Sequence, residues 1–350
     1  MPTPPDFDNF TCPLPLQPGE RVVLGHGSGG RLSHDLLTRV ILPALGEIAP
    51  RTLDDSAVVE TGAQSAFTTD SYVVRPLFFP GGDIGRLAVC GTVNDLAMIG
   101  AEPIALGCGF VLEEGLPLEI LERVARSMRA AALEAGVYLA AGDTKVVEKG
   151  KADGLFINTS GIGRLRPGRS ISGAGAKPGD VVIVSGAVGD HGIAVLSARE
   201  GLGFETDLKS DAAPLNGLVA AMLAAGEIHA MRDPTRGGLA TTLCELAAQS
   251  NVCIEVDEQA IPLHAPVRAA CEMLGFDPLY VANEGKLTAC VPAADAEKIL
   301  AAMRAQKYGA EAAVIGRVKE APRGQVRLRT VIGGTRIVDM LPGEMLPRIC

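Results

Sequence analysis

Carboxylates lie inside two neighbouring predicted strands in the first half of the chain. Asp54 and Asp55 fall within the stretch Leu53 to Val59, and Asp70 falls within Ala66 to Val74. Asp is depleted from strand interiors, so these three side chains need a reason to be there. The competing interpretation is an edge or strand-end position that faces water. For any single residue that interpretation is about as strong as a functional one.

A predicted helix that begins at Ile84 carries the next two polar side chains. Asn94 and Asp95 continue, at helical spacing, the apolar stripe that contains Leu87 and Met98, so we expect both to point inward. An inward carboxylate must be paired or bind a metal, because an isolated buried charge is costly. Hard oxygen ligands suit Mg²⁺. An Asp near a helix end that makes only local hydrogen bonds is the alternative.

An acid and a lysine lie close together after a third strand. The predicted strand Val137 to Ala141 runs into Gly142-Asp143-Thr144-Lys145. Asp143 and Lys145 share one face if the chain stays extended. One of them can then ligate a metal while the other meets a phosphate or exchanges a proton. A surface ion pair is the common alternative.

Two motifs in the second half also carry chemistry. Asp233, Thr235 and Arg236 precede a predicted helix, Leu239 to Ser250, which places an acid, a hydroxyl, a guanidinium and free N–H groups at its N-terminus. Glu284 lies in Asn283-Glu284-Gly285, between two predicted strands. A plain hairpin residue is the favoured alternative for Glu284 in a generic protein, at roughly two to one.

A Gly-rich turn, Gly25 to Gly30, opens a predicted helix that contains Leu32 and Leu36. Its unblocked backbone N–H groups can bind an anion at a helix start. It lacks the spacing and the Lys of a P-loop, so the signal is weak, and a simple turn is the alternative.

The chain ends on a thiol. Met340 to Cys350 contains Pro342, Gly343 and Pro347, which suit neither a long helix nor a central strand. We therefore expect a mobile arm. Ten extended residues span roughly 33 Å, enough to carry Cys350 into a cleft elsewhere on the molecule. A frayed end without a role is the alternative.

Composition bounds the remaining possibilities. The chain has 350 residues, 47% of them hydrophobic, and a net charge of −9 without a basic cluster, so we expect a globular protein that does not bind nucleic acid. The longest apolar stretch, Gly217 to Gly226, is about half of what a membrane helix needs. No secretory signal is evident. We expect a cytoplasmic protein whose eight cysteines are mostly free thiols.

The order of predicted elements indicates an α+β protein of two domains, with helices on one side of the first sheet. A Pro-rich arm, residues 1–20, precedes an N-terminal domain at 21–164. A C-terminal α/β domain at 165–339 and the tail at 340–350 follow. The second domain is predicted to contain the following elements: strand Asp180 to Ser185, helix Leu215 to Ala225, helix Leu239 to Ser250, strand Cys253 to Val256, helix Ala265 to Leu274, strands Leu279 to Ala282 and Lys286 to Val291, helix Ala293 to Gln306 and strand Ala313 to Val318.

Taken together, the motifs resemble those of a known family. LGHGSGG, DDSAVV, TTDSYVV, GTVNDLAMIGA, GDTKVV, DPTRGG, NEGKL and the terminal PRIC look like the hydrogenase maturation protein HypE family. That family belongs to the superfamily of aminoimidazole ribonucleotide synthetase, selenophosphate synthetase and thiamine monophosphate kinase. The resemblance runs from about Val22 to Cys350. The acidic motifs specify only the superfamily, and PRIC is the family-specific part.

The resemblance implies an activity. The terminal thiol receives a carbamoyl group from the carbamoyltransferase HypF, and ATP is used to dehydrate it to a thiocyanate through a phosphorylated carboxamide. The cyanide then passes to iron on the HypC–HypD scaffold of nickel-iron hydrogenase maturation. The resemblance also implies a homodimer whose N-terminal sheets join into a barrel.

Site roles follow from the same resemblance. Mg²⁺ would be bound by Asp54, Asp55 and Asp95. Cys350 would carry the substrate, with Lys145 and Glu284 moving protons. ATP would contact Gly27, Ser28, Gly29, Gly30, Asp70, Asn94, Asp143, Thr144, Asp233, Thr235 and Arg236. A small-molecule kinase or ATP-dependent cyclo-ligase of the same fold stays open, and so does a non-catalytic assembly partner.

Overall fold

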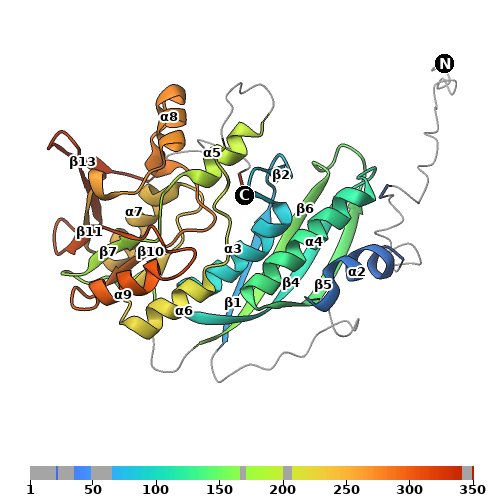
Figure 1. Ribbon diagram of the computed structural model, residues 1–350, viewed down its shortest axis with the longest axis horizontal. Helices are drawn as coiled ribbons and strands as arrows, with labels where there is room; N and C mark the ends of the chain where they lie inside the picture. Colours follow the sequence, from blue (N-terminus) through green and yellow to red (C-terminus); the bar gives the residue numbers. More distant parts are fainter. Residues whose placement is uncertain (1–20, 23–34, 49–64, 166–170, 200–206, 341–348) are drawn as a thin grey trace, which may run out of the picture.

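The computed structural model describes residues 21–22, 35–48, 65–165, 171–199, 207–340 and 349–350 (Figure 1). Several predicted site residues lie outside these ranges, namely Gly27, Ser28, Gly29, Gly30, Asp54 and Asp55, as does the predicted strand Leu53 to Val59. Within the described part, two α+β units lie side by side, as expected from the sequence.

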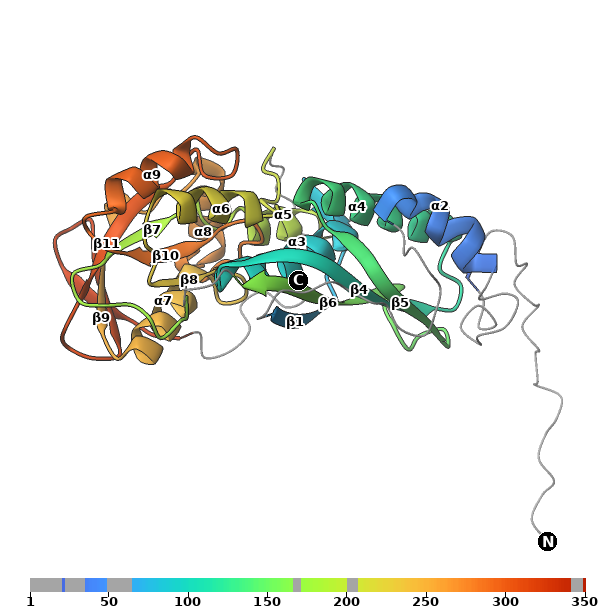
Figure 2. The same cartoon turned by 90° about the horizontal axis from the view of Figure 1, so that it is seen from below.

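The first unit is a four-stranded sheet with helices on one face. Its strand order is β1-β6-β4-β5, with β5 parallel to β4 and the other pairs antiparallel. Figure 2 shows α3 and α4 above this sheet and no helix of the described residues on its other face. The elements are β1 Ser65–Tyr72, β2 Phe78–Phe79, β3 Gly82–Asp83, α3 Ile84–Met98, β4 Ala101–Glu113, α4 Leu118–Ala135, β5 Tyr138–Val147 and β6 Leu155–Leu165, after the short η2 Leu37–Ile41, α2 Leu42–Leu45 and η3 Gly46–Ile48.

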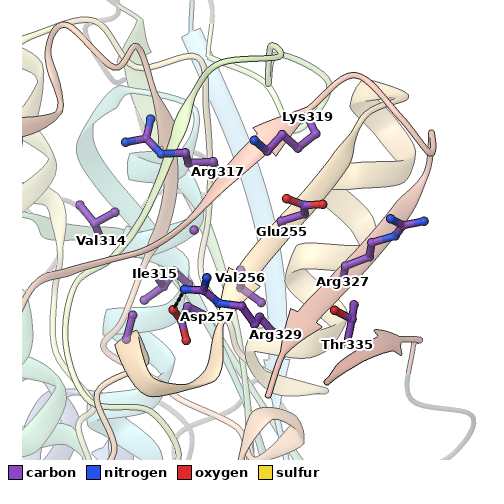
Figure 3. A pocket seen from close by; sticks show the side chains of 12 residues that line it. Glu255, Val256, Asp257, Val314, Ile315, Arg317, Lys319, Arg327, Arg329 and Thr335 are labelled. Carbon is purple, nitrogen blue, oxygen red and sulfur yellow. Dashed lines mark hydrogen bonds and ion pairs between the residues drawn. The ribbon is translucent and has the colours of Figure 1, made fainter. Parts of the chain in front are cut away.

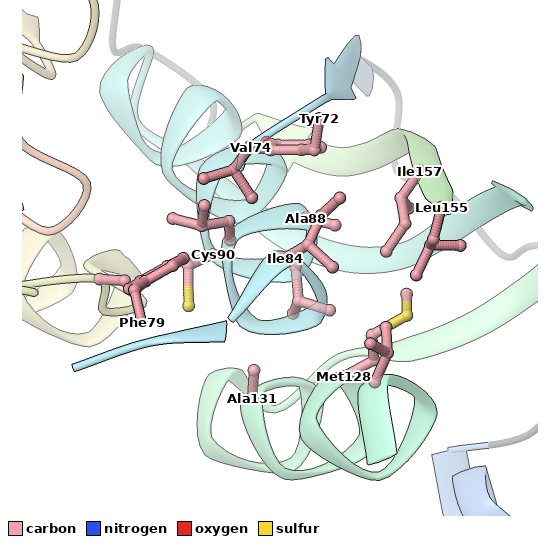
Figure 4. Packing of buried hydrophobic residues seen from close by; sticks show 14 of the residues in the cluster. Tyr72, Val74, Phe79, Ile84, Ala88, Cys90, Met128, Ala131, Leu155 and Ile157 are labelled. Carbon is pink, nitrogen blue, oxygen red and sulfur yellow. The ribbon is translucent and has the colours of Figure 1, made fainter. Parts of the chain in front are cut away.

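Local sequence explains where these two helices begin and end. Asp83 caps α3, because its side chain accepts from the backbone N–H groups of Gly85 and Arg86. Gly136 ends α4 in the left-handed conformation (φ 73°), which glycine adopts without steric cost. Apolar side chains of α3, α4 and the sheet meet in one core (Figure 4).

The second unit is a seven-stranded sheet in the order β13-β12-β9-β11-β7-β10-β8. Helix α7 packs against one face in a cluster with β9 and β12, while α6 and α9 pack together beside β7 and β10. The elements are β7 Val181–Val184, α5 Asp190–Ser197, α6 Asn216–Ala225, β8 Ala230–Arg232, α7 Gly238–Ser250, β9 Cys253–Asp257, η4 Glu258–Ala260, α8 Ala265–Leu274, η5 Pro278–Tyr280, β10 Thr288–Val291, α9 Ala296–Arg304, β11 Ala313–Lys319, β12 Gln325–Arg329 and β13 Thr335–Val338.

One predicted strand of this domain is wrong. Leu279 to Ala282 contains the end of the 3₁₀ turn η5, because Pro278 opens that turn and the Asp277 side chain accepts from the backbone N–H of Leu279. Glu284 therefore joins a turn to β10 and not two strands. Three strands of the sheet, β8, β12 and β13, were not predicted.

No helix among the described residues is long and apolar enough to cross a membrane. Seven cysteines in the described part are free thiols, and all except Cys350 are buried.

Candidate functional site: an acidic cluster at the end of the chain

Four predicted site acids come together where the two domains meet. Asp70 lies on β1 and Asp95 near the end of α3, while Asp233 follows β8 and Glu284 precedes β10. Each of Asp70, Asp95 and Asp233 acts electrostatically on Glu284. Chain segments more than 200 residues apart thus contribute to one acidic cluster, which we define as Asp70, Asp95, Asp233 and Glu284.

Burial and nearby charges raise the pKa values of three acids of this cluster, Asp95, Asp233 and Glu284. Burial, with the charge of Asp70 adding to it, raises the pKa of Asp95 to about 6, although the Thr68 hydroxyl donates to its carboxylate at 2.9 Å. Burial and the charge of Asp95 raise the pKa of Asp233 to about 7. Both carboxyls therefore change charge near neutral pH, where small changes in their surroundings shift their ionisation.

Glu284 has the strongest perturbation. Its side chain is 3% exposed, and burial together with the charges of Asp233 and Asp211 raises its pKa well above the ordinary value. One carboxyl oxygen has no hydrogen-bond partner among the described residues. The backbone N–H of Glu284 donates to Asp211 at 2.9 Å, which fixes the loop. Burial and the neighbouring charges therefore favour the protonated form of the Glu284 carboxyl.

The end of the chain lies against this cluster. Arg236 donates to the Cys350 sulfur at 3.2 Å, and the backbone N–H of Val73 donates to the Cys350 carbonyl at 3.1 Å. Burial, helped by the charge of Glu284, raises the pKa of the Cys350 thiol to about 11. The predicted carrier thiol is thus a protonated sulfur that accepts from Arg236 and lies within the electrostatic influence of Glu284.

The motif around Arg236 has the local structure that the sequence predicts. Residues 233–236 precede α7, and Gly237 and Gly238 adopt φ of 85° and 63°. A Cβ at Gly238 would lie 2.5 Å from the carbonyl oxygen of Leu279, so only glycine lets this turn approach η5. That approach places Asp233 beside Asp95 and Arg236 beside the tail.

Asn94 points inward as predicted, but its amide binds backbone. It donates to the Ala213 carbonyl at 3.1 Å and accepts from the Leu215 N–H at 2.8 Å, which fastens α3 to the second domain. Helix α3 is buried on nearly every side, so its polar positions do not mark a solvent face. A direct contact of Asn94 with a nucleotide stays a prediction.

Asp143 and Lys145 lie apart from the cluster. They form an ion pair at 2.9 Å, with side chains 68% and 64% exposed, and that hydrogen bond lowers the pKa of Asp143. In the register of the sheet, Asp143 is level with Gly109 and Asn158, on the face without helices. Thr144 alternates to the helix side. Within one chain, Asp143 and Lys145 thus form a surface ion pair, which was the alternative interpretation of these two residues.

The part of the chain that the structure describes also contains hollows outside the acidic cluster, of which two are rich in basic side chains. One, of about 480 Å³, lies on β9, β11 and β12 and is lined by basic side chains, among them Arg317, Lys319 and Arg327 (Figure 3). The other, of about 760 Å³, lies between the domains and is lined by Arg86, Lys286 and other residues. It reaches Asp211, whose carboxylate pairs with Lys286 at 3.1 Å.

Sequence reasoning missed two buried residues that support the site. Asn283 accepts from the Gly189 N–H at 2.7 Å and donates to the Pro234 carbonyl at 2.8 Å, so it ties the loop of Asp233 to that of Glu284. His191 contacts the tail. Asn283 lies in the motif NEGKL quoted above, and His191 lies in the Gly-rich stretch GAVGDHG, residues 186–192. An unexplained polar side chain inside a Gly-rich turn is the signal that could have found them.

The donor set fits magnesium only in part. Carboxylate oxygens are the ligands Mg²⁺ prefers, and the cluster offers four carboxyl groups, one of which has an oxygen without a hydrogen-bond partner among the described residues. Yet no group of three or more His, Cys, Asp or Glu side chains in the described ranges is arranged to hold a metal ion. A complete site therefore needs further oxygens, such as those of Asp54, Asp55 or nucleotide phosphates.

Comparison with known proteins identifies the family. The AIR synthase related protein N-terminal domain model matches residues 53–165, and the corresponding C-terminal domain model matches residues 177–329. Carbamoyl dehydratase HypE of Azotobacter vinelandii is 56% identical over 331 residues, which cover 94% of this chain and 97% of the relative. The chain belongs to the carbamoyl dehydratase HypE family.

Solved HypE structures agree with this fold. The crystal structure of hydrogenase maturation protein HypE in complex with ATP matches with a TM-score of 0.90 and 51% identity, over 94% of this chain and 99% of that one. A HypE–HypF complex matches with a TM-score of 0.77 and 52% identity, over 79% of this chain and 90% of that one. Thiamine-monophosphate kinase from Stenotrophomonas maltophilia, at 24% identity and TM-score 0.61, shares the fold alone.

Proposed function

We propose that this chain is an ATP-dependent carbamoyl dehydratase that converts an S-carbamoyl group on its own Cys350 to a thiocyanate, for the cyanide ligand of nickel-iron hydrogenase. The observation that carries the proposal is the docked chain end, with the Cys350 sulfur 3.2 Å from Arg236 and within electrostatic reach of Glu284. A substrate carried on that sulfur lies inside the acidic cluster.

The reaction divides into two steps. The carboxamide oxygen takes the γ-phosphoryl group of ATP and the nitrogen loses a proton, which leaves an S-bound phosphorylated imidate and ADP. The C–O bond then breaks, phosphate departs with the electron pair, and the nitrogen loses its second proton as the C≡N bond forms. Phosphorylation is needed because a carboxamide oxygen is a poor leaving group.

Residues of the chain meet the demands of each step. Arg236 holds the sulfur and offers positive charge to the developing phosphate. Glu284, next to the sulfur, accepts a proton from the carboxamide nitrogen once it is ionised. Glu284 ionises only when positive charge relieves the repulsion from Asp70, Asp95 and Asp233. Binding of a cation at the acidic cluster would therefore make Glu284 available as a base.

Magnesium and ATP complete the site. Asp95 with Asp54 and Asp55 would hold Mg²⁺, which, when bound, supplies positive charge that disperses the charge of the transferring phosphoryl group. Asp70, Asp143, Thr144, Asp233 and Thr235, with Asn94 and the turn Gly27, Ser28, Gly29 and Gly30, would contact ATP. The ATP complex of a relative 51% identical to this chain supports the nucleotide assignment.

The partners follow from the chemistry. The carbamoyltransferase HypF loads Cys350, consistent with the HypE–HypF complex of a relative, and the HypC–HypD iron scaffold receives the cyanide. We place these exchanges in the cytoplasm, where a free terminal thiol persists.

The face of the first sheet without helices supports a homodimer. It carries Asp143 and Lys145, and Phe67 on the edge strand β1 is 72% exposed. An edge strand with an exposed aromatic ring favours pairing with another chain. We propose that in such a dimer Lys145 acts on the second copy and removes the second proton. Phe67→Asp should convert the dimer to a monomer in light scattering, and unchanged mass would contradict this pairing.

Phosphate release tests the proposed function. Carbamoylated protein should release one phosphate from ATP per Cys350, and protein lacking Arg348 to Cys350 should release none. A small-molecule kinase or cyclo-ligase of the same fold would turn over ATP without the last three residues. Absence of any ATP turnover by the carbamoylated chain would favour a non-catalytic partner.

A further inference from the structure

The last two described residues are held by contacts that the chemistry does not use. His191, on α5, is fully buried, and its Nε2 lies 2.6 Å from the backbone carbonyl oxygen of Ile349. Its Nδ1 lies 2.8 Å from the hydroxyl of Ser210. The Ile349 side chain is 3% exposed within the main apolar core. The chain end is therefore inserted as a peptide and not laid on the surface.

The hydrogen-bond partners fix the state of His191. A carbonyl oxygen only accepts, so Nε2 must carry the proton that it donates to Ile349. In a neutral imidazole Nδ1 then accepts, and Ser210 is arranged to donate, because its hydroxyl already accepts from the Ala212 N–H at 3.1 Å. Burial lowers the pKa of His191 and favours this neutral form.

The surroundings hold the ring in place. Phe79 packs edge-on against it, with ring centroids 5.4 Å apart and an interplanar angle of 86°. The backbone N–H of Ser210 donates to the Pro80 carbonyl at 2.8 Å. The donor aimed at Ile349 thus has little freedom to turn away.

We propose that His191, together with the apolar site that receives the Ile349 side chain, forms a binding socket for the C-terminal Ile-Cys dipeptide. The ligand class is a peptide end with a branched apolar penultimate residue. Two backbone contacts, Ile349 to His191 and Cys350 to Val73, set the register of the sulfur against Arg236 and Glu284. His191 is a positioning residue. The inference rests on the proposed function in one respect, which is that the Cys350 sulfur carries the reacting group.

Access to the Cys350 thiol measures docking without catalysis. The full-length protein is treated with iodoacetamide, cleaved after Glu344, and the C-terminal peptide is quantified by mass spectrometry. Ile349→Asp should raise the alkylation rate of Cys350 at least about tenfold, because a buried apolar contact is replaced by a charge. His191→Leu should raise it by about three- to tenfold, the effect of one lost hydrogen bond. His191→Gln, which retains an N–H donor, should restore part of the protection.

Matched variants guard against a general loss of structure. His229→Gln changes another largely buried histidine, which pairs with Asp180 at 2.9 Å, and Ile332→Asp changes an isoleucine that is 91% exposed. Both should leave the alkylation rate unchanged. If His191→Leu does not fold, the alkylation rate of Ile349→Asp alone tests the socket, since this substitution alters only the tail. Alkylation within twofold of the wild type in every Ile349 and His191 variant that folds would overturn the socket.

A second readout separates the socket from the proposed function. Single-turnover dehydration of carbamoylated protein should slow in His191→Leu and Ile349→Asp while ATP affinity is unchanged. Faster alkylation in the variants, with no dehydration even by the wild type, would support the socket and contradict the function. If the wild type dehydrates the carbamoyl group and the variants do so at the same rate, the socket proposal is wrong and the proposed function is supported.

Discussion

The acidic cluster and the helix-free face of the first sheet carry the same kinds of residues in opposite environments. Glu284 is buried and Asp95 half-buried, and burial is the main cause that raises the pKa of each, with the charge of Asp70 adding to both. Asp143 is exposed beside Lys145, which lowers its pKa. The acids of the cluster thus have their pKa values set by burial and by one another, whereas the exposed pair is a surface ion pair within one chain.

The largest effect should come from removing the sulfur that the cluster receives. Cys350→Ala should abolish carbamoyl loading and thiocyanate formation and leave ATP binding unchanged, because nothing else carries the substrate. Mass analysis and ATP titration measure the two properties. Cys12→Ala, outside the matched domains, is the control. Loading of Cys350→Ala to the wild-type level would refute the carrier role.

Next in size is the loss of one buried acid. Asp95→Asn should load carbamoyl normally but dehydrate about 100-fold more slowly or worse, because the charge that orders metal and phosphates is removed. Rates of phosphate release and of thiocyanate formation measure this. Thiocyanate formation at the wild-type rate would mean that the metal assignment is wrong.

Mixed dimers sharpen the contrast between the two regions. Cys350→Ala and Lys145→Ala chains, each inactive alone, should regain roughly a quarter of wild-type activity when co-refolded in equal amounts, since half the dimers then contain one complete site. This recovery is the expected result if Lys145 acts across the interface of the proposed dimer. Cys350→Ala mixed with Glu284→Gln should recover nothing, because Glu284 serves the tail of its own chain. Equal recovery of activity in both mixtures would contradict the prediction that Lys145 acts on the other chain while Glu284 acts on its own.

The smallest effect concerns stability against pH. In the folded chain Asp95 and Asp233 have raised pKa values, about 6 and about 7, so the folded state binds more protons than the unfolded state from about pH 4 to 7. The stability of metal-free protein should therefore fall as pH rises through that window. The apparent melting temperature of Asp95→Asn should fall less. Parallel curves for both proteins would show that Asp95 ionises normally.

Periodicity predicted most of the fold. The helix beginning at Ile84 and the helix Ala265 to Leu274 match α3 and α8, because long apolar stripes with clear caps determine a helix locally. Strands β12 (QVRLR) and β13 (TRIV) were missed, because each is short and its apolar residues are interrupted by arginine. Leu279 to Ala282 was misjudged because Asp277 and Pro278 impose a turn that hydrophobicity does not reveal.

The site was predictable in its residues but not in its geometry. Asp233 and Glu284 stood out as motif acids, yet only the tertiary fold brings them against Asp95 and raises their pKa values. His191 is separated from Ile349 by 158 positions, and no local pattern encodes that contact. Asn94 was correctly expected to point inward, but its partners are backbone groups of the other domain.

The central claim is that the docked Cys350 carries an amide which the acidic cluster dehydrates. Its most direct test is mass analysis of the C-terminal peptide after incubation with the carbamoyltransferase, carbamoyl phosphate and ATP. The account predicts that the carbamoylated peptide loses the mass of one water when ATP is present and keeps it when ATP is omitted. A carbamoyl group that stays intact with ATP and magnesium, or that is lost equally without them, would contradict it.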